Sequence, residues 1–247
     1  MCAFAWPNHC SGAVSLTFDD AARSQLDNAI PALDRHWVRG TFYVSLHHDH
    51  WRNRIADWRA AAQRGHEIAN HSLRHPCGRN FDFITPETAL ENYTLERMEM
   101  ELREASRILR EAIPGQTDFS FAYPCGQKYV GDGESRQSYV PVVARQFLAA
   151  RGLGEVANHP LKCDLMDVWS WMVQRISAEE MIRMTEEAVA QGKWAVFCYH
   201  GIGGDHFPVA TEALEGLANH LTRNQDRIWT DTFLNVAKHI AAARRSN

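Results

Sequence analysis

The chain has 247 residues, a length normal for one α/β barrel, and we expect a single domain over residues 1–247. Its 45% content of hydrophobic residues can fill a large core, and its net charge of −4, with scattered basic residues, argues against nucleic-acid binding. No apolar stretch approaches the length of a membrane span.

The N-terminal stretch from Met1 to Pro7 lacks the charged and apolar regions of a signal peptide. We therefore expect a cytoplasmic protein if Met1 is the native start, and a secreted protein if a leader has been removed. The six cysteines do not decide between these compartments, because they are too few to define a disulfide scaffold although their even number permits pairing. The sequence does not indicate an oligomeric state.

Short apolar strands alternate with amphipathic helices along the chain, which predicts a parallel sheet covered by helices. The expected strands cover residues 14–18, 40–45, 67–70, 119–123 and 194–199. The expected helices cover residues 24–36, with Ser24 as the cap and a kink at Pro31, then 51–64, 95–109, 177–192 and 232–244. Residues 128–138 are rich in glycine and charge, and we expect them to form a mobile loop.

Candidate functional residues stand at the ends of the expected strands. They are Asp19, Asp20, His71, His75, Cys125 and His200. In α/β barrels the loops that follow the strands converge on one face, and the active site forms there. We therefore expect these residues to meet, although they are far apart in the sequence.

One aspartate and two histidines form a three-ligand set that leaves a position open for water or substrate, as in catalytic zinc sites. Asp20, His71 and His75 supply such a set, and the adjacent Asp19 is a candidate base for that water. Taken separately, the histidines fit a surface pair and the aspartates fit a charge pair at a helix N-terminus. Their combination at strand ends favours the metal site.

A second candidate metal site is the run formed by His47, His48, Asp49 and His50. These residue types suit zinc. A polar loop on the rim of the cleft is the better explanation, because no distant partner is evident.

Four short motifs carry a resemblance to a known family. They are Thr-Phe-Asp-Asp from Thr17 to Asp20, His-Ser-Leu-Arg-His from His71 to His75, Ala-Tyr-Pro-Cys from Ala122 to Cys125, and the strand end Tyr199-His200. In order and spacing they resemble the polysaccharide deacetylases, carbohydrate esterase family four, from about Trp6 to about Ile240. The resemblance implies an α/β fold, a distorted and incomplete (β/α) barrel of the polysaccharide deacetylase type.

The resemblance also implies a role for each matching residue. Asp20, His71 and His75 would hold a divalent metal, most often zinc, with cobalt, nickel and manganese as alternatives. The metal would lower the pKa of a bound water and polarise the acetyl carbonyl. Asp19 would take the proton of the attacking water, and His200 would protonate the leaving group. The backbone N–H of Cys125 would stabilise the oxyanion.

The chain departs from the family pattern in the third motif. Ala122 stands where the family has an arginine that pairs with the catalytic aspartate. We therefore expect the pKa of Asp19 to be less depressed, unless Arg74 or Arg79 substitutes for that arginine.

The expected substrate pocket is drawn from residues near the third and fourth motifs. Trp169 or Trp171 would form the apolar wall of an acetyl pocket, and Tyr123 lies beside the expected oxyanion donor. Asp167 would orient His200. Ordinary core packing explains each tryptophan equally well, and Tyr123 is a weaker candidate because alternate strand residues often point into the core.

Two Pro-Cys steps suggest a disulfide. Cys77 follows His75 and Pro76, and Cys125 follows Pro124, so the two cysteines should meet if the second and third motifs meet at the metal. A bond closing so long a span typically stabilises a fold by a few kcal/mol. The alternative is two free buried cysteines, since bonding also requires an oxidising compartment.

We therefore predict a metal-dependent hydrolase that removes acetyl groups from N- or O-acetylated carbohydrate by attack of a metal-activated water. A glycan containing N-acetylglucosamine and acetylxylan are both candidates, so the expected partner is an acetylated oligo- or polysaccharide. One alternative is a cyclic-imide or ureide amidohydrolase of the same fold. The other is a non-catalytic carbohydrate-binding protein, which the presence of Asp19 and His200 disfavours.

Overall fold

The computed structural model describes residues 4–46 and 49–245. Its centre is a curled sheet with the strand order β7-β4-β3-β2-β1-β9-β8, and β10 pairs with the beginning of β1. The strands are β1 (Gly12–Asp19), β2 (Gly40–Val44), β3 (Glu67–Asn70), β4 (Phe121–Ala122), β7 (Ala150–Arg151), β8 (Trp171–Met172), β9 (Trp194–Tyr199) and β10 (Ile228–Thr230). They pair in parallel, as the alternation of strands and helices predicted.

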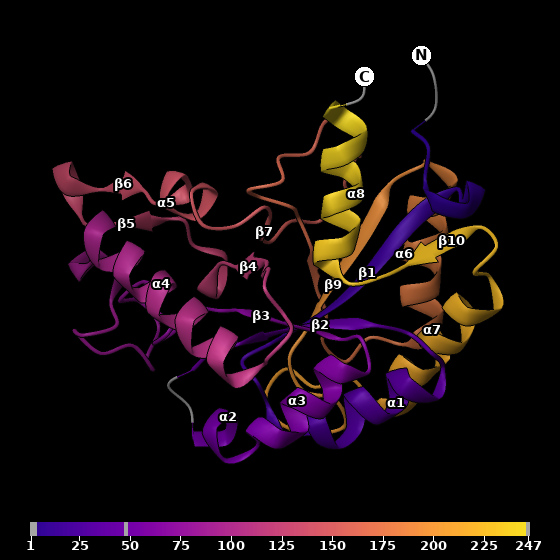
Figure 1. Ribbon diagram of the computed structural model, residues 1–247, viewed down its shortest axis with the longest axis horizontal. Helices are drawn as coiled ribbons and strands as arrows, with labels where there is room; N and C mark the ends of the chain where they lie inside the picture. The colour runs from indigo at the N-terminus through magenta and orange to yellow at the C-terminus, as the bar shows by residue number, and fades with distance from the viewer. Residues whose placement is uncertain (1–3, 47–48, 246–247) are drawn as a thin grey trace.

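Helices flank the sheet, and α8 lies on the opposite side of the strands from α1 and α3 (Figure 1). The α-helices are α1 (Ile30–Arg35), α2 (Asp49–Asn53), α3 (Ile55–Gln63), α4 (Leu95–Ala112), α5 (Val140–Ala144), α6 (Ala178–Ala190), α7 (Thr211–Arg223) and α8 (Phe233–Arg245). Among the described residues, no helix has the length and apolar character needed to cross a membrane.

Strand β1 separates two environments, because successive side chains of a strand point to opposite faces. Both faces of β1 are buried. Val14, Leu16 and Phe18 belong to the core that packs beneath the outer helices. The alternate residues, Thr17 and Asp19 among them, therefore face the inside of the curled sheet.

Helix α8 closes this interior at the end where the strands begin. The ring of Phe233 packs against Trp194, the first residue of β9, with ring centroids 4.9 Å apart. Thr41 Oγ1 accepts a hydrogen bond from the backbone N–H of Phe233 (2.8 Å), and the carboxylate of Glu67 accepts one from that of Leu234 (3.1 Å). The opposite end of the interior, where the strands finish, remains available for a site.

The two edge strands of the sheet meet through an isolated bridge between Arg151 of β7 and Val168, shortly before β8. Strands β4, β7 and β8 have two residues each, so few strand hydrogen bonds hold this side of the barrel. The fold is therefore a distorted, incomplete (β/α) barrel, which confirms the prediction.

Two predicted helices differ from the structure. Residues 24–36 form a π-helix over Gln25–Ala29 followed by α1. The side chain of Ser24 does not cap it, because the hydroxyl instead accepts a hydrogen bond from the backbone N–H of Ile202 (3.0 Å). The helix predicted over residues 51–64 is divided at Arg54 into α2 and α3.

Residues 128–138 form an antiparallel hairpin of β5 (Tyr129–Val130) and β6 (Gln137–Ser138), rather than the expected mobile loop. Asp132 and Ser135 cap its turn reciprocally, and these local contacts order the glycine-rich segment. The sequence does not predict β7, β8 or β10, because two or three residues are too few for a periodic signal.

Helix α4 carries one buried and one exposed residue whose substitutions test how the core is packed. Leu102 lies on the inner face of this helix and is fully buried, whereas Met100 on the same helix is 64% exposed. We expect Leu102→Ala to lower the free energy of unfolding by about 2–5 kcal/mol, because it leaves a cavity. Met100→Ala should change that free energy by less than about 0.5 kcal/mol. Denaturant unfolding followed by circular dichroism measures both, and equal effects would contradict the packing.

Candidate active site

The candidate residues lie where the central strands end. Asp19 is the last residue of β1, and Asp20 follows it. His71 follows β3, and His200 follows β9. Parallel strands end at the same edge of a sheet, so the topology brings together residues that are far apart in the chain.

Asp20, His71 and His75 converge as expected for metal ligands. Asp20 Oδ1 lies 3.2 Å from His75 Nε2 and 3.5 Å from His71 Nε2. One ligand atom from each residue lies within 4.8 Å of the others. Nitrogen and oxygen ligands about 2.0–2.2 Å from a tetrahedral zinc ion are roughly 3.4 Å apart, so these spacings fit one ion.

The hydrogen bonds around the cluster also fit a metal. His71 Nδ1 donates to the backbone carbonyl of Ala122 (2.9 Å), which leaves the lone pair of Nε2 directed to the cluster. Asp20 Oδ1 is buried and accepts no hydrogen bond from the described residues, although two imidazole nitrogens lie close to it. A buried carboxylate oxygen without a donor is an expected partner for a cation.

Electrostatics keep Asp20 ionised. Burial would raise its pKa, but the hydrogen bond from His206 and the nearby imidazoles of His71 and His75 outweigh burial and hold that pKa well below its usual range. A divalent cation binds an ionised carboxylate together with imidazole nitrogens that have lost their protons.

Three residues in or beside the ligand cluster have backbone conformations that non-glycine residues rarely adopt. The φ angles are 75° for Asp20, 53° for His75 and 54° for Cys125. Such left-handed residues cost conformational energy and gather at functional sites, where the surrounding structure holds them in place. The conformations of these three residues therefore depend on the contacts of the loops that carry them.

The partner of Asp19 is Arg151, the last residue of β7. Arg151 is buried, and its guanidinium donates to Asp19 Oδ2 and to Ser170 Oγ (3.0 Å). Neither Arg74 nor Arg79, the two possible substitutes for the missing arginine, takes that role, because both side chains bind carboxylates elsewhere. Arg74 pairs with Glu101 at 3.4 Å, and Arg79 pairs with Asp132 at 2.8 Å.

This pairing also corrects the expected charge state of Asp19. Burial would raise the pKa of Asp19, but Arg151, together with His71 and His200, outweighs burial and lowers that pKa. The pKa of Arg151 is raised, since Asp19 more than offsets the effect of its own burial. Asp19 Oδ1 remains buried and accepts no hydrogen bond from the described residues, so it is free to accept a proton.

His200 lies beside this cluster, with Nε2 3.8 Å from Asp20 Oδ2. Burial lowers its pKa, although Asp19 and Asp20 oppose that effect. The buried side-chain amide of Gln25 donates to the backbone carbonyls of both Asp19 and His200, and so fixes the ends of β1 and β9 together. No local pattern in the sequence marks Gln25, because its partners belong to two distant strands.

Asp167 does not orient His200, contrary to expectation. Its carboxylate forms an ion pair with Lys128 (2.5 Å), and His200 Nδ1 is buried without a hydrogen-bond partner among the described residues. A different histidine joins the cluster. His206 Nε2 lies 2.8 Å from Asp20 Oδ2, and this hydrogen bond raises the pKa of the half-exposed His206 imidazole.

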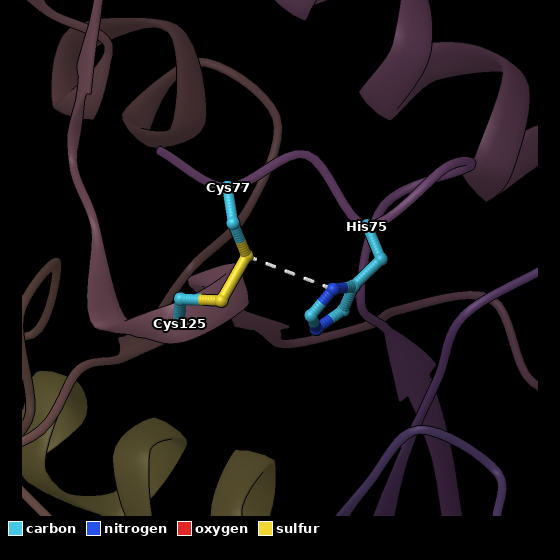
Figure 2. Close-up of side chains that lie close together, drawn as sticks. All are labelled: His75, Cys77 and Cys125. Carbon is cyan, nitrogen blue, oxygen red and sulfur yellow. Dashed lines mark hydrogen bonds between the residues drawn. A yellow bond between two sulfur atoms is a disulfide. The ribbon is translucent and has the colours of Figure 1, made fainter. Parts of the chain in front are cut away.

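The predicted disulfide between Cys77 and Cys125 is present, with Cα atoms 6.0 Å apart. Figure 2 shows the ring of His75 facing this bond, with Nδ1 3.7 Å from Cys77 Sγ. The bond joins the loop that follows β3 to the short turn Pro124–Gly126 that follows β4. Cys125 is thereby held beside the ligand cluster.

The rival metal site over residues 47–50 falls mostly outside the described part of the chain. Residues 47 and 48 are not described, and neither is the side chain of Asp49. The described imidazole of His50 accepts a hydrogen bond from Arg23 Nε (3.1 Å).

A family model for polysaccharide deacetylases matches residues 7–139, which is more than half of the chain. The chain belongs to the polysaccharide deacetylase family. The family resemblance read from the sequence is therefore confirmed. Among curated proteins, no sequence matches this chain.

Solved structures share the fold of this chain. One is a Mycobacterium smegmatis protein assigned to the polysaccharide deacetylases, with 18% identity and a TM-score of 0.66 over 98% of this chain and 94% of that one. A second is a family 4 acetyl xylan esterase from Clostridium thermocellum in complex with a cobalt ion, with 18% identity and a TM-score of 0.56 over 92% and 90%. A third is a CE4 family pseudoenzyme from Bacillus anthracis, with 15% identity and a TM-score of 0.52 over 93% and 66%.

Two of the three aromatic residues expected in the substrate pocket are packed elsewhere. Tyr123 is buried in the helix-facing core and donates its hydroxyl to the carbonyl of Met166 (2.8 Å). Trp171 is half-buried against Phe197, with ring centroids 5.5 Å apart. The positions of Tyr123 and Trp171 therefore favour ordinary core packing over a role in the substrate pocket. Trp169 is 45% exposed, so its side chain is the most accessible of the three.

The buried pair of Arg151 and Asp19 predicts a large loss of stability. In metal-free protein, we expect Arg151→Met to lower the free energy of unfolding by about 3–5 kcal/mol at pH 7, because it leaves the buried Asp19 carboxylate without its cation. Arg145→Met is the matched control, since Arg145 pairs with Glu99 at the surface and should cost less than about 1 kcal/mol.

The same variant has a predicted pH dependence. The folded-state pKa of Asp19 lies below the unfolded value of about 3.9, so its contribution to stability is present above that pH and is lost as the pH falls through the folded pKa. The stability difference between wild type and Arg151→Met should therefore shrink on acidification. Urea unfolding between neutral and acidic pH measures it, and a difference that is constant with pH would contradict the pairing.

Proposed function

We propose that this protein is a metal-dependent hydrolase that removes acetyl groups from acetylated carbohydrate. Membership of the polysaccharide deacetylase family supports the class of reaction. The observation that carries the proposal is the cluster of Asp20, His71 and His75 beside a buried second carboxylate, Asp19. On this proposal residues 1–247 act as one catalytic domain.

Asp20, His71 and His75 would hold the metal, and zinc suits their mixed nitrogen and oxygen donors. The cobalt ion in the Clostridium thermocellum esterase supports a divalent transition metal, with cobalt, nickel and manganese as alternatives to zinc. When bound, such an ion lowers the pKa of water and polarises a carbonyl group.

Asp19 is the proposed general base. Arg151 binds Asp19 Oδ2 and keeps the carboxylate ionised, while Oδ1 has no hydrogen-bond donor among the described residues. Asp19 thus offers one oriented oxygen that can take a proton from water attacking the acetyl carbon.

His200 is the proposed acid for the departing amine or alcohol, and the backbone N–H of Cys125 is the proposed donor to the developing oxyanion. His200 approaches the cluster from β9, and Cys125 approaches it from the turn after β4. A substrate acetyl group between these two positions would meet a proton donor on one side and a backbone donor on the other.

The substrate is an acetylated oligo- or polysaccharide on this proposal. The acetyl xylan esterase supports an O-acetylated chain, and the same residues serve an N-acetylglucosamine amide. The pseudoenzyme shows that this fold also occurs without activity. The ion pair of Asp19 and Arg151 favours catalysis, because a structural metal site needs no buried, ionised base beside it.

Acetate release tests the proposal. We expect zinc-loaded protein to release acetate from acetylated xylo-oligosaccharides or chito-oligosaccharides, and a chelator to abolish the release reversibly. Asp20→Ala should abolish both zinc binding, measured by calorimetry, and acetate release. Full activity after removal of all metal would reject the metal-dependent mechanism.

The base and the acid have separate tests. Asp19→Asn and His200→Ala should each reduce kcat by at least ~100-fold, because each removes a proton-transfer group. Metal content, measured by mass spectrometry, should stay near that of wild type in both variants. Near-normal acetate release from either variant would remove that residue from its assigned role.

A further inference from the structure

We propose that the disulfide between Cys77 and Cys125 positions the active site, so that its reduction lowers the hydrolytic activity. The inference rests on the proposed function for its activity readout. It concerns a different property, namely the position of the loop that carries His75 relative to the turn that carries Cys125.

The disulfide links the loop of a proposed metal ligand to the turn of the proposed oxyanion donor. Cys77 lies two residues after His75, and Cys125 itself supplies the proposed oxyanion donor. A further link between the same loops is the hydrogen bond from the backbone N–H of Gly78 to Gln127 Oε1 (2.6 Å). Reduction would therefore loosen the two loops without detaching them.

Cys77 is the fixed end of this link. Its side chain is fully buried, its N–H donates to the carbonyl of Thr88 (3.2 Å), and its carbonyl accepts from Leu90 N–H (2.9 Å). Cys125 is half-exposed, and it lies in a short turn after a strand of two residues. The covalent bond thus ties the partly exposed turn of Cys125 to a buried loop that is hydrogen-bonded on both sides of the Cys77 peptide.

We expect the backbone conformation of Cys125 to change when the disulfide is reduced. Its φ of 54° is in the left-handed region, which a non-glycine residue keeps only when its surroundings enforce it. A change of φ would alter the direction in which the N–H of Cys125 points. An oxyanion donor is effective only at a narrow distance from the developing charge, so the loss should appear mainly in kcat.

The disulfide also fixes the tautomer of His75. A disulfide sulfur can only accept a hydrogen bond, so the contact of 3.7 Å with Cys77 Sγ places the hydrogen of His75 on Nδ1 (Figure 2). Nε2, which lies 3.2 Å from Asp20 Oδ1, then keeps its lone pair for a metal. A thiol can also donate, which would permit the other tautomer and weaken metal binding.

The reduction has a defined chemistry. A water-soluble phosphine attacks one sulfur, the second sulfur leaves as a thiolate, and water then converts the phosphonium to a phosphine oxide. The products are two thiols and one phosphine oxide, with the oxygen and both protons supplied by water. A dithiol would reach the same state by thiol–disulfide exchange and become a disulfide itself, and Cys125 is the more exposed of the two bonded cysteines.

The test compares zinc-loaded wild type before and after phosphine treatment and anaerobic desalting. We expect reduction to lower kcat about tenfold with a smaller change in KM, and to weaken zinc binding several-fold. Re-oxidation should restore both. Cys77→Ala/Cys125→Ala should match the reduced wild type and should not respond to phosphine. Because this variant keeps the free cysteines Cys10, Cys163 and Cys198, it controls for effects at those thiols.

Gln127→Ala is the matched control for the second link between the loops, and it should cause a smaller loss than reduction. Alkylation and mass spectrometry establish that the disulfide has opened, and circular dichroism establishes that the protein remains folded. If the double variant does not fold, the reduced and re-oxidised wild type still give the comparison.

Unchanged kcat and zinc affinity in folded, fully reduced protein would overturn the inference, even if the melting temperature falls. That result would leave the disulfide a purely stabilising bond. If the oxidised wild type releases no acetate, the proposed function fails instead. The zinc affinities of the oxidised and reduced forms then still decide the positioning role.

Discussion

The buried ion pair between Asp19 and Arg151 is the constraint around which the site is arranged. A carboxylate inside a barrel is stable as an anion only with a close, well-fitted cation, because burial alone favours its neutral form. Arg151 meets this need from β7, at the edge of the sheet. It leaves one oxygen of Asp19 without a donor among the described residues, where the proposed chemistry needs a base.

The sheet makes this pairing possible. Strands β1 and β7 lie far apart in the strand order, so the two charges meet only because the sheet curls and Arg151 bridges to Val168 near the other edge. Gln25 then fixes the ends of β1 and β9, while the disulfide fixes the loops after β3 and β4. Helix α8 fills the opposite end of the interior, so the functional groups gather at one end.

The sequence predicted the parts of the site that depend on local patterns. The paired aspartates and the two histidines stand next to apolar strands, which suggested the ligand set, and the family resemblance of their motifs implied the distorted barrel. Arg151, Gln25 and His206 carry no such pattern, since each acts on a residue from a distant strand. Their roles depend on how the sheet curls, which periodicity does not encode. Asp167 was assigned to His200 from a motif alone, and Lys128 binds it instead.

The central claim is that Asp20, His71 and His75 bind one metal ion beside an ionised Asp19 held by Arg151. Anomalous diffraction from a crystal grown with zinc tests it most directly. The account predicts one strong peak about 2.0–2.2 Å from Asp20 Oδ1 and the Nε2 atoms of both histidines, with Asp19 still on Arg151. A peak between His200 and His206 without His71, or no peak at the cluster in zinc-saturated crystals, would contradict it.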